Sequence, residues 1–508
     1  MNRRCQEMEL LLAVDIGTGS CRSAIFTPEL KQVGSAAVEY PTNYPQPDWA
    51  EQDPETIYQA IIKAIKESMA NSQLKSGDIT VLTFDCSVHT LLGLGKDKTP
   101  VTPVLTWEDS RARKMVDDWK RRGEWGELYS LTGCPLHPMY SPAKIAWWRE
   151  HDPERFKKIA YYVTLKAFIL YRFTGKLLED QATLSGTGLL NIHRLDWEDE
   201  ALKLAGITRE QVGPAAPPTL IIEGLRAEAA SSTGLSPSIK IVIGSSDAAM
   251  SSLGSGTVRP EQMTVMIGTS GAARRLITKP VLDPQRRTFC YYSGNNIWFA
   301  GGAINNGGVV LRWFRDNFGD RAALEAKERG VSVYTVLSDY AARVNPGAGG
   351  LLFLPFLAGE RAPYWNGDMR GICFGVSLHH DQAAFVRALM EGVSYRMYSV
   401  VKPLNEIVGQ AEEIRVTGGF SRSAVWLQIL ADVFGRDLSV TYQPEGSVFG
   451  AAAFAFHTLG ELKSLTVLEE MNPVKQVVHA RPELHRFYSQ EFERFLRIYH
   501  RLKDEFGA

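Results

Sequence analysis

Residues 10–26 read L-L-L-A-V-D-I-G-T-G-S-C-R-S-A-I-F, and this stretch decides the fold. An apolar strand ends near Asp15, the chain turns through Gly17, Thr18 and Gly19, and a second strand-like run follows. A glycine-threonine turn between two strands exposes backbone N–H groups and a hydroxyl, which are the donors that phosphate oxygens require. The stretch therefore predicts a phosphate-binding hairpin.

A second copy of this hairpin lies in the other half of the chain, where residues 263–277 read M-T-V-M-I-G-T-S-G-A-A-R-R-L-I. Its Gly268 and Thr269 are in register with the first turn, but Met266 stands where Asp15 stood. One carboxylate between two phosphate hairpins suits a single Mg²⁺ ion. The two copies predict ATP held between related halves of the chain, with Asp15 as the Mg²⁺ ligand.

A glycine-rich turn between strands has commoner roles than phosphate binding. A single copy is most often just a tight turn in which glycine supplies the backbone freedom. Two copies separated by about half the chain point instead to a duplicated unit. Dinucleotide fingerprints and P-loops run from strand through glycines to a helix, whereas a second strand follows the glycines in both copies here. The motif is neither of those two.

Composition sets the broad class of the protein. The chain has 508 residues, 44% hydrophobic and 22% charged, which suits a globular protein of two large domains. A formal net charge of −1 gives no general attraction to nucleic acid or to anionic membranes. No apolar stretch is long enough to span a bilayer, and the six cysteines show no metal-binding spacing. We expect a cytoplasmic protein; the sequence does not decide the oligomeric state, for which a homodimer stays open.

Strand-like and helix-like segments alternate in both halves, which indicates an α/β protein. The predicted strands are 35–40, 79–84, 91–94, 101–105, 239–243, 351–356, 414–417 and 438–441, and the predicted helices are 54–70, 111–121, 142–150, 382–401, 424–434 and 449–459. The Gly- and Ser-containing segment 251–258 is expected to join the halves. We therefore divide the chain into domains 1–250 and 251–508.

Asp247 is the strongest candidate for a catalytic residue. It follows an apolar strand in I-K-I-V-I-G-S-S-D-A-A-M, residues 239–250, and precedes a predicted helix. Aspartate at such a position often caps the helix, so a cap and a general base are equal alternatives on this segment alone. A carboxylate at the carboxyl end of a strand near a domain junction is well placed to accept a proton from a substrate hydroxyl.

Two polar residues of the first half are candidates for substrate binding. His89 and Asp109 each follow an apolar run, and loops at strand ends commonly build ligand sites. The alternatives are a buried structural histidine and a surface ion pair of Asp109 with Arg111 or Arg113.

Glycine-rich passages of the second half are candidates for the nucleotide site. Gly419 and Ser423 lie in V-T-G-G-F-S-R-S, residues 416–423, and Gly308 lies in A-G-G-A-I-N-N-G-G-V-V, residues 300–310. Each passage leads from a strand into a helix, and glycines there allow a flat ring to approach the backbone. An ordinary strand-to-helix turn is the alternative.

With these residues assembled, the chain resembles the FGGY family of carbohydrate kinases from about residue 10 to residue 460. Two stretches match the family signatures: M-Y-S-P-A-K-I-A-W-W-R-E-H at 139–151, and G-I-C-F-G-V-S-L followed by F-V-R-A-L-M-E-G within 371–392. The resemblance implies two actin-like (ribonuclease-H-like) domains with an interdomain cleft for ATP and sugar. It also implies that Asp247 is the base. The ATP-contacting positions it implies are Gly17, Thr18, Gly19, Gly268, Thr269, Gly308, Gly419 and Ser423.

Within the family, the chain is most similar to the gluconate kinases, in stretches such as S-V-H-T-L at 87–91 and R-A-P-Y-W-N-G-D-M-R-G at 361–371. The implied reaction converts D-gluconate to 6-phosphogluconate. A xylulose kinase, or another polyol or ketose kinase of the family, is the alternative, and an actin- or chaperone-like ATP switch is a distant one. Gluconate needs a cation or amide donors for its carboxylate, and Lys144, Arg111 and His89 stay open as partners.

Overall fold

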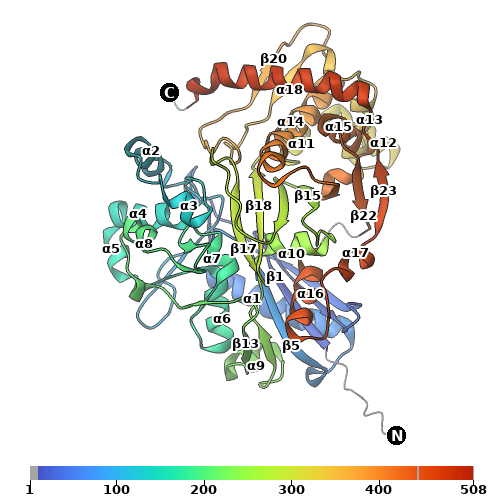
Figure 1. Cartoon of the computed structure of the whole chain (residues 1–508). Coiled ribbons are helices and arrows are strands. Elements are labelled where there is room, and N and C mark those ends of the chain that lie inside the picture. Colours follow the sequence, from blue (N-terminus) through green and yellow to red (C-terminus); the bar gives the residue numbers. More distant parts are fainter. Residues whose placement is uncertain (1–9, 443–445, 507–508) are drawn as a thin grey trace.

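The computed structural model describes residues 10–442 and 446–506, which form two lobes, each built around a mixed β-sheet (Figure 1). The first sheet has the order β13-β14-β5-β1-β2-β3. Its strands are β1 (Leu10–Ile16), β2 (Ser20–Phe26), β3 (Gln32–Glu39), β5 (Ile79–Cys86), β13 (Ile221–Glu223) and β14 (Lys240–Val242). Strands β1, β5 and β14 run parallel, so their carboxyl ends meet at one edge of the sheet.

Strand β1 is buried along its whole length because helices cover both faces of its sheet. Leu12 and Val14 belong to the apolar cluster that contains α1 (Pro54–Ser72). The alternate residues Leu11 and Ala13 belong to the cluster that contains α16 (Ser447–Leu459), as expected for a strand whose side chains alternate between faces. A helix from near the end of the chain thus covers the first sheet.

The second sheet has the order β17-β18-β16-β15-β21-β22-β23. Its strands are β15 (Gln262–Ile267), β16 (Gly271–Ile277), β17 (Phe289–Gly294), β18 (Ile297–Ile304), β21 (Glu413–Thr417), β22 (Leu438–Thr441) and β23 (Val474–Val478). Its hairpin β15–β16 corresponds to β1–β2, and the parallel strands β21 and β22 correspond to β5 and β14. The duplication predicted from the two hairpins is therefore present in the folded chain.

Helices of the second half surround this sheet, with the 27-residue α14 packed against β16 and β18 (Figure 1). These helices are α11 (Val309–Phe318), α12 (Asp320–Arg329), α13 (Val333–Ala342), α14 (Gln382–Val408), α15 (Ala424–Phe434), α17 (Val467–Met471) and α18 (Pro482–Leu502). The short hairpin β19 (Leu352–Leu354) and β20 (Ile372–Phe374) lies beside α14 and α18. Amphipathic spacing accounts for this packing, since these helices present apolar stripes to the sheet.

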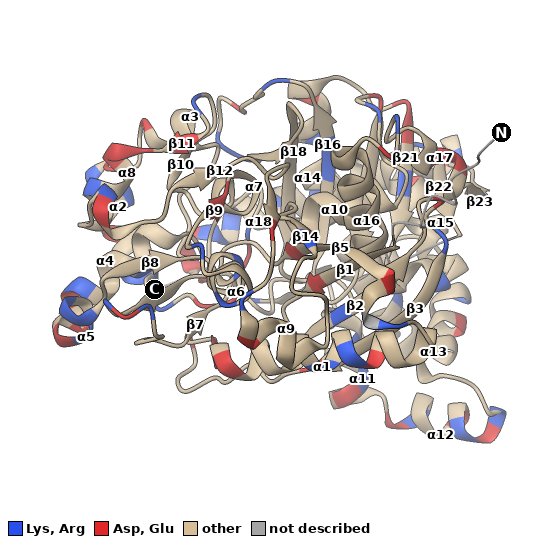
Figure 2. Cartoon of the chain, turned by 90° about the horizontal axis from the view of Figure 1, so that it is seen from below, with Lys and Arg blue, Asp and Glu red and all other residues tan. Residues whose placement is uncertain are grey.

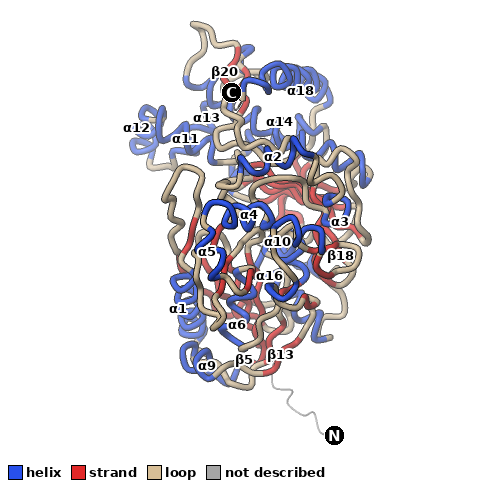
Figure 3. The backbone as a smooth tube through the Cα atoms, turned by 90° about the vertical axis from the view of Figure 1, so that its left-hand side faces the viewer, coloured by secondary structure: helices blue, strands red, loops and turns tan. Residues whose placement is uncertain are grey.

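An extension of the first half carries short helices and two-stranded pairs. Figures 1 and 3 show α2, α3, α4 and α5 gathered to one side of the first sheet. The helices of this half are α2 (Arg113–Arg122), α3 (Leu128–Thr132), α4 (Ser141–His151), α5 (Pro153–Lys158), α6 (Leu165–Thr174), α7 (Gln181–Ser185), α8 (Asp199–Ala205), α9 (Ala227–Thr233) and α10 (Asp247–Gly254). The short strands are β4 (Glu51–Gln52), β6 (Leu92–Leu94), β7 (Val104–Leu105), β8 (Tyr161–Val163), β9 (Glu179–Asp180), β10 (Leu190–Asn191), β11 (Asp196–Trp197) and β12 (Ala215–Ala216).

The predicted strands and helices are all present, with shifted ends. The strand predicted over 101–105 shrinks to the two residues of β7, because residues 101–103 lie in a loop. The segment 251–258, predicted to join the halves, instead begins inside α10, which runs on to Gly254. The domain boundary at residue 250 therefore stays a prediction.

Charged residues of both signs are interspersed on the surface, as Figure 2 shows on α8 and α12. This agrees with the formal net charge of −1. In the described part of the chain, no helix has the length and apolarity that crossing a bilayer would require.

Candidate active site

Three carboxylates gather where β1, β5 and β14 end. Asp15 on β1 is directly in register with Asp85 on β5. Asp247 follows β14, and the parallel bridge between Cys86 and Ser246 extends the pairing of β14 with β5 as far as the residue before it. The charges of Asp15 and Asp247 raise the pKa of Asp85, and the charge of Asp15 also raises the pKa of Asp247, because negative charges repel. The parallel strand order thus brings together residues that lie up to 232 positions apart, from 15 to 247.

Asp15 has one oxygen engaged and one available. The Ser447 hydroxyl at the start of α16 donates to Asp15 Oδ2 at 2.6 Å. Oδ1 is buried and has no hydrogen-bond partner within residues 10–442 and 446–506. A buried carboxylate oxygen without a donor is a suitable ligand for a hard cation such as Mg²⁺. Within the described residues, no three His, Cys, Asp or Glu side chains are arranged to hold a metal ion by themselves, so a Mg²⁺ ion at Asp15 would need further oxygen ligands from phosphate or water.

Asp85 is a member of this group that the sequence patterns did not single out. It is fully buried, and neither of its carboxyl oxygens has a hydrogen-bond partner in the described part of the chain. Burial raises its pKa well above the usual range for aspartate, and the charge of Asp15 raises it further. The available signal was its position at the end of an apolar, β-branched strand, the same signal that singled out Asp247.

Asp247 is not the cap of its helix, because Ser246 fills that role. Ser246 is the N-cap of α10, with its hydroxyl accepting from the Ala249 N–H at 3.4 Å. Asp247 is the first helical residue, and one of its oxygens accepts from the Ala248 N–H at 2.6 Å. Its side chain is only partly buried. The capping alternative is therefore excluded.

The surroundings of Asp247 tune its basicity. Burial raises the pKa of Asp247 to about 7, the charge of Asp15 raises it, and the Arg274 guanidinium opposes the shift. A carboxyl group whose pKa lies near neutral pH combines a useful unprotonated fraction with the strongest affinity for a proton. The position and the pKa both suit a general base.

The first hairpin turn is held by side chains that come from later loops. The Tyr40 hydroxyl donates to the Gly17 carbonyl at 2.5 Å, and Gln52 Nε2 donates to the Thr18 carbonyl at 2.5 Å. Trp107 Nε1 donates to the Thr18 hydroxyl at 3.0 Å. Gly19 is exposed, and a Cβ atom there would contact nothing within 4 Å. Side-chain hydrogen bonds thus hold Gly17 and Thr18 in place, while the tip of the turn at Gly19 is exposed to solvent.

The second hairpin forms one wall of a cavity of about 660 Å³. All five nucleotide candidates of the second half line this cavity: Gly268, Thr269, Gly308, Gly419 and Ser423. Gly308 closes on the hairpin, with its N–H donating to the Gly268 carbonyl at 2.7 Å, and a Cβ at Gly308 would lie 2.7 Å from that oxygen. A Cβ at Gly419 would meet nothing within 4 Å, so this side of the cavity stays free for a flat ring. The cavity has the size of a small-molecule or cofactor site.

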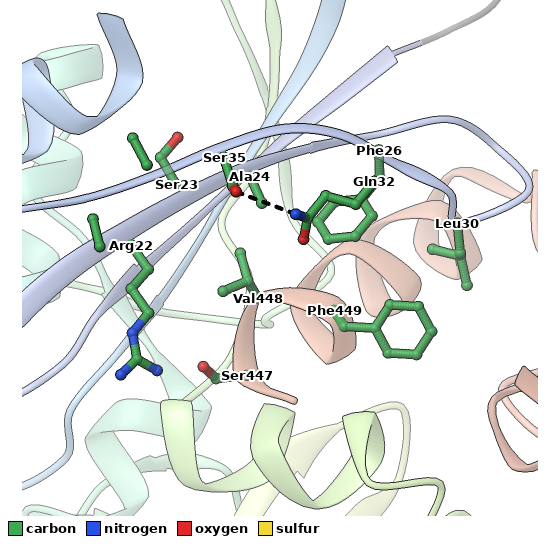
Figure 4. Close-up of a pocket in the computed structure, with 12 residues that line it drawn as sticks. Arg22, Ser23, Ala24, Phe26, Leu30, Gln32, Ser35, Ser447, Val448 and Phe449 are labelled. Carbon is green, nitrogen blue, oxygen red and sulfur yellow. Dashed lines mark hydrogen bonds between the residues drawn. The ribbon is translucent and has the colours of Figure 1, made fainter. Parts of the chain in front are cut away.

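A smaller cavity of about 380 Å³ lies between β2, β3 and the start of α16 (Figure 4). Ser447, which donates to Asp15, lines it together with Phe26 and Phe449. No predicted site residue lines this cavity.

His89 is buried and neutral. Its Nδ1 lies within hydrogen-bond distance of the Gly186 carbonyl, so that nitrogen carries the proton and Nε2 is left as an acceptor. Burial lowers the pKa of His89 to about 3, and the positive charge of Arg361 adds to this shift. Its ring lies edge-on to Tyr140 and Tyr291, whose hydroxyls share a hydrogen bond of 2.7 Å. A neutral acceptor between two hydroxyls suits a polyol rather than a carboxylate.

Asp109 is paired with Arg111, as one of the alternatives predicted, but the pair is buried and not on the surface. Arg111 also pairs with Glu51 at 2.6 Å and lies over the Trp49 ring at 3.9 Å, while Asp109 accepts from the Ala50 N–H at 2.9 Å. Both groups therefore already have charged or backbone partners. They hold together the loops that surround the site.

Lys144, the third cation considered for a carboxylate, also supports loops. Its ammonium group donates to the Thr106 carbonyl at 2.6 Å and to the His89 carbonyl at 3.3 Å. Burial lowers its pKa to about 7, which halves its charge near neutral pH. Lys144 connects the loops that carry the candidate substrate residues.

Two arginines of the second half reach the same region and were missed from the sequence. Arg274 projects from β16, and its charge acts on Asp247 and Tyr291. Arg361 follows β19, lies over the Trp107 ring at 4.5 Å, and its charge acts on His89. Both lie in stretches quoted from the sequence, 263–277 and 361–371, but the local pattern gave neither arginine a role, because only the packing of the second half against the first brings their charges to Asp247 and His89.

Models of known protein families match both halves of the chain. The N-terminal domain of the FGGY family of carbohydrate kinases matches residues 10–254, and the C-terminal domain of that family matches residues 263–459.

Individual carbohydrate kinases also match the chain over most of its length. The chain is 37% identical to a gluconokinase of Bacillus subtilis over 462 residues, which cover 91% of this chain and 90% of that protein. A crystal structure of a gluconate kinase from Lactobacillus acidophilus superposes with a TM-score of 0.91 at 29% identity, covering 98% of this chain and 99% of that one. A ligand-bound xylulose kinase structure from the same organism gives the same TM-score, identity and coverage.

Proposed function

We propose that this chain, which belongs to the FGGY family of carbohydrate kinases, uses ATP to convert D-gluconate into 6-phosphogluconate. Membership of the family makes it an ATP-dependent phosphotransferase that acts on a carbohydrate, and this rules out the ATP switch as its main role. Family membership does not identify the acceptor, so the choice of gluconate is a separate step of the proposal.

One observation carries the choice of gluconate: the 37% identity to a gluconokinase extends over 91% of the chain. The overall shape does not discriminate, because a gluconate kinase and a xylulose kinase structure superpose equally well. Xylulose, or another polyol or ketose, is therefore the alternative acceptor.

In the proposed reaction, Asp247 accepts the proton of the terminal hydroxyl of the sugar acid as that oxygen attacks the γ-phosphorus of ATP. The bond between the γ-phosphorus and the bridging oxygen breaks, and ADP leaves. His89, through its unprotonated Nε2, and the paired hydroxyls of Tyr140 and Tyr291 orient the polyol. Positioning of this kind supplies much of the rate in phosphoryl transfer.

The phosphates are proposed to lie between the two hairpin turns, contacted by Gly17, Thr18 and Gly19 on one side and by Gly268 and Thr269 on the other. The adenosine occupies the 660 Å³ cavity beside Gly308, Gly419 and Ser423. Asp15 would hold Mg²⁺, directly or through water, and the bound ion would neutralise phosphate charge. In this arrangement, residues 1–250 mainly bind sugar and residues 251–508 mainly bind ATP.

The experiment that tests the proposal is release of ADP from ATP and Mg²⁺ with and without D-gluconate. We expect ADP release to depend on gluconate, with 6-phosphogluconate identified by mass spectrometry as the product. Release of ADP at the same rate without any acceptor would contradict the proposal.

A further inference from the structure

We propose that the guanidinium groups of Arg274 and Arg361, both from the second half of the chain, together bind the carboxylate of the substrate. This inference rests on the proposed function, because only a sugar acid brings a carboxylate to this site.

Arg361 is buried and Arg274 is partly buried, and neither has the carboxylate partner that several buried arginines of this chain have. Arg111, Arg387 and Arg396 each form an ion pair with a carboxylate, at 2.6 to 3.2 Å. Arg274 and Arg361 form no ion pair within the described ranges of the chain, and the Nε of each is buried without a hydrogen-bond partner. Buried charges are normally paired, so an anion from outside the chain is expected here.

The bonding of Arg361 leaves one side of its guanidinium free. Nη2 donates to the Ile304 carbonyl at 3.1 Å, and the Trp107 ring covers one face of the group at 4.5 Å. Glu360, the neighbouring carboxylate, is already occupied by Arg396 at 3.2 Å. Nε therefore stays available, and a charged N–H group donates strongly to a carboxylate oxygen.

The charges of the two arginines act on the candidate base and on a residue proposed to orient the sugar. Arg274 acts on Asp247, the base for the terminal hydroxyl, and also on Arg361. Arg361 acts in turn on His89 and His137, in the part of the site formed by the first half. In the proposed complex, the terminal hydroxyl meets Asp247 and the carboxylate lies near the two arginines. Although burial lowers the pKa of Arg361 to about 10, the group keeps its charge at neutral pH.

The three cations suggested by the sequence are less suitable. Lys144 donates to two backbone carbonyls, and His89 is neutral. Arg111 has a buried Nη1 without a hydrogen-bond partner, but its charge is already paired with Asp109 and Glu51. A neutral imidazole accepts hydrogen bonds from hydroxyls but offers no charge to a carboxylate.

The test compares D-gluconate with D-gluconamide, its neutral analogue of nearly equal shape, as acceptors for the parent and for Arg361→Gln and Arg274→Gln. For the parent, kcat/KM should favour gluconate. In each variant, kcat/KM for gluconate should fall by about 10²- to 10³-fold, since loss of one partner of a buried charge pair costs that much. The value for gluconamide should change by less than about tenfold, so the preference collapses.

A matched control is Arg113→Gln. Arg113 also reaches across the two halves, but it has carboxylate partners at Asp48 and Asp368, both at 2.9 Å. This variant should keep the preference for gluconate. Calorimetric titration of each variant with gluconate and ATP separately should show weakened gluconate binding for Arg361→Gln and Arg274→Gln and unchanged ATP binding for all three.

The outcomes separate the two proposals. Equal losses for gluconate and gluconamide, or an unchanged preference in both variants, would overturn the carboxylate site while the gluconate assignment stands. A parent enzyme that prefers a neutral ketopentose to gluconate would overturn the proposed substrate and this inference with it.

Discussion

At the scale of single residues, Asp247 is the proposed general base, and replacing it by asparagine tests this role without removing the helix start. Asp247→Asn keeps the size of the side chain but removes the base, so kcat should fall by about 10²- to 10⁴-fold. Binding of ATP and gluconate, measured by calorimetry, should change little.

The control for this variant is its neighbour. Ser246→Ala removes the true N-cap of α10 and should cost about 1 kcal/mol of stability while leaving most of the turnover. Full turnover in a folded Asp247→Asn protein would show that another group takes the proton.

The pKa of Asp247 also predicts a pH profile. A base works only when unprotonated, and its pKa of about 7 places half of the population in the inactive protonated form at that pH. We therefore expect kcat/KM for gluconate to rise about tenfold for each pH unit below 7 and to level off above it. A profile that is flat between pH 5 and pH 7 would argue against Asp247 as the base.

The unequal hairpins give an asymmetric prediction. Asp15→Ala should abolish most turnover and weaken the dependence of the rate on Mg²⁺, since Asp15 Oδ1 has no other task among the described contacts. Met266→Leu, at the corresponding place in the second hairpin, conserves volume and should be nearly silent. Mg²⁺ titrations that coincide for Asp15→Ala and the parent would contradict the assignment of the metal ligand.

At the scale of elements, the crossing of α10 and α16 brings the proposed base near the proposed metal ligand. Helix α10 begins with Asp247, and α16 begins with Ser447, which donates to Asp15. The two helices meet through glycines, and a Cβ atom at Gly450 would lie 2.0 Å from the Met250 carbonyl oxygen. Gly450 is therefore needed for the close approach and not for an unusual backbone angle.

Gly450→Ala should force the helices apart, lowering stability by about 1 to 3 kcal/mol and turnover as well. The measurement is thermal unfolding together with kcat. Gly77→Ala, where a Cβ would meet nothing within 4 Å, is the matched control and should change stability by less than about 0.5 kcal/mol. An unaltered melting temperature for Gly450→Ala would show that the crossing can relax.

The elements themselves were largely predictable from periodicity, because amphipathic spacing and apolar runs are local properties. The strand after residue 239 and the helix after residue 424 appear as expected, as β14 and α15. The ends of α10 were not predictable, since Ser246 and Asp247 are equally good caps on sequence alone. Only the backbone geometry assigns the cap to Ser246.

At the scale of the whole molecule, the duplication explains both what the sequence predicted and what it missed. The two hairpins predict two similar sheets. In each sheet, two parallel strands follow the first strand of the hairpin: β5 and β14 in the first sheet, and β21 and β22 in the second. The contacts between the halves produce no periodic pattern in the sequence. Arg274, Arg361 and the packing of α16 on the first sheet therefore emerged only from the folded chain.

The groups that the two halves bring together define the chemical groups that the substrate must offer. Neutral His89 and the Tyr140–Tyr291 pair come with two arginines that lack carboxylate partners within the described residues, so the site offers hydroxyl-binding groups and positively charged groups together. A site built for a charged group discriminates against substrates that lack it, because its own donors are then left without partners.

The most direct test of the gluconate assignment is kcat/KM for a panel of acceptors at saturating ATP and Mg²⁺: D-gluconate, D-xylulose, D-ribulose and glycerol. We expect gluconate to exceed each neutral acceptor by at least about 10²-fold, with ³¹P spectra showing the phosphate on the terminal carbon. A neutral ketopentose with the highest kcat/KM would contradict the assignment and leave the chain a carbohydrate kinase of the same family with a different substrate.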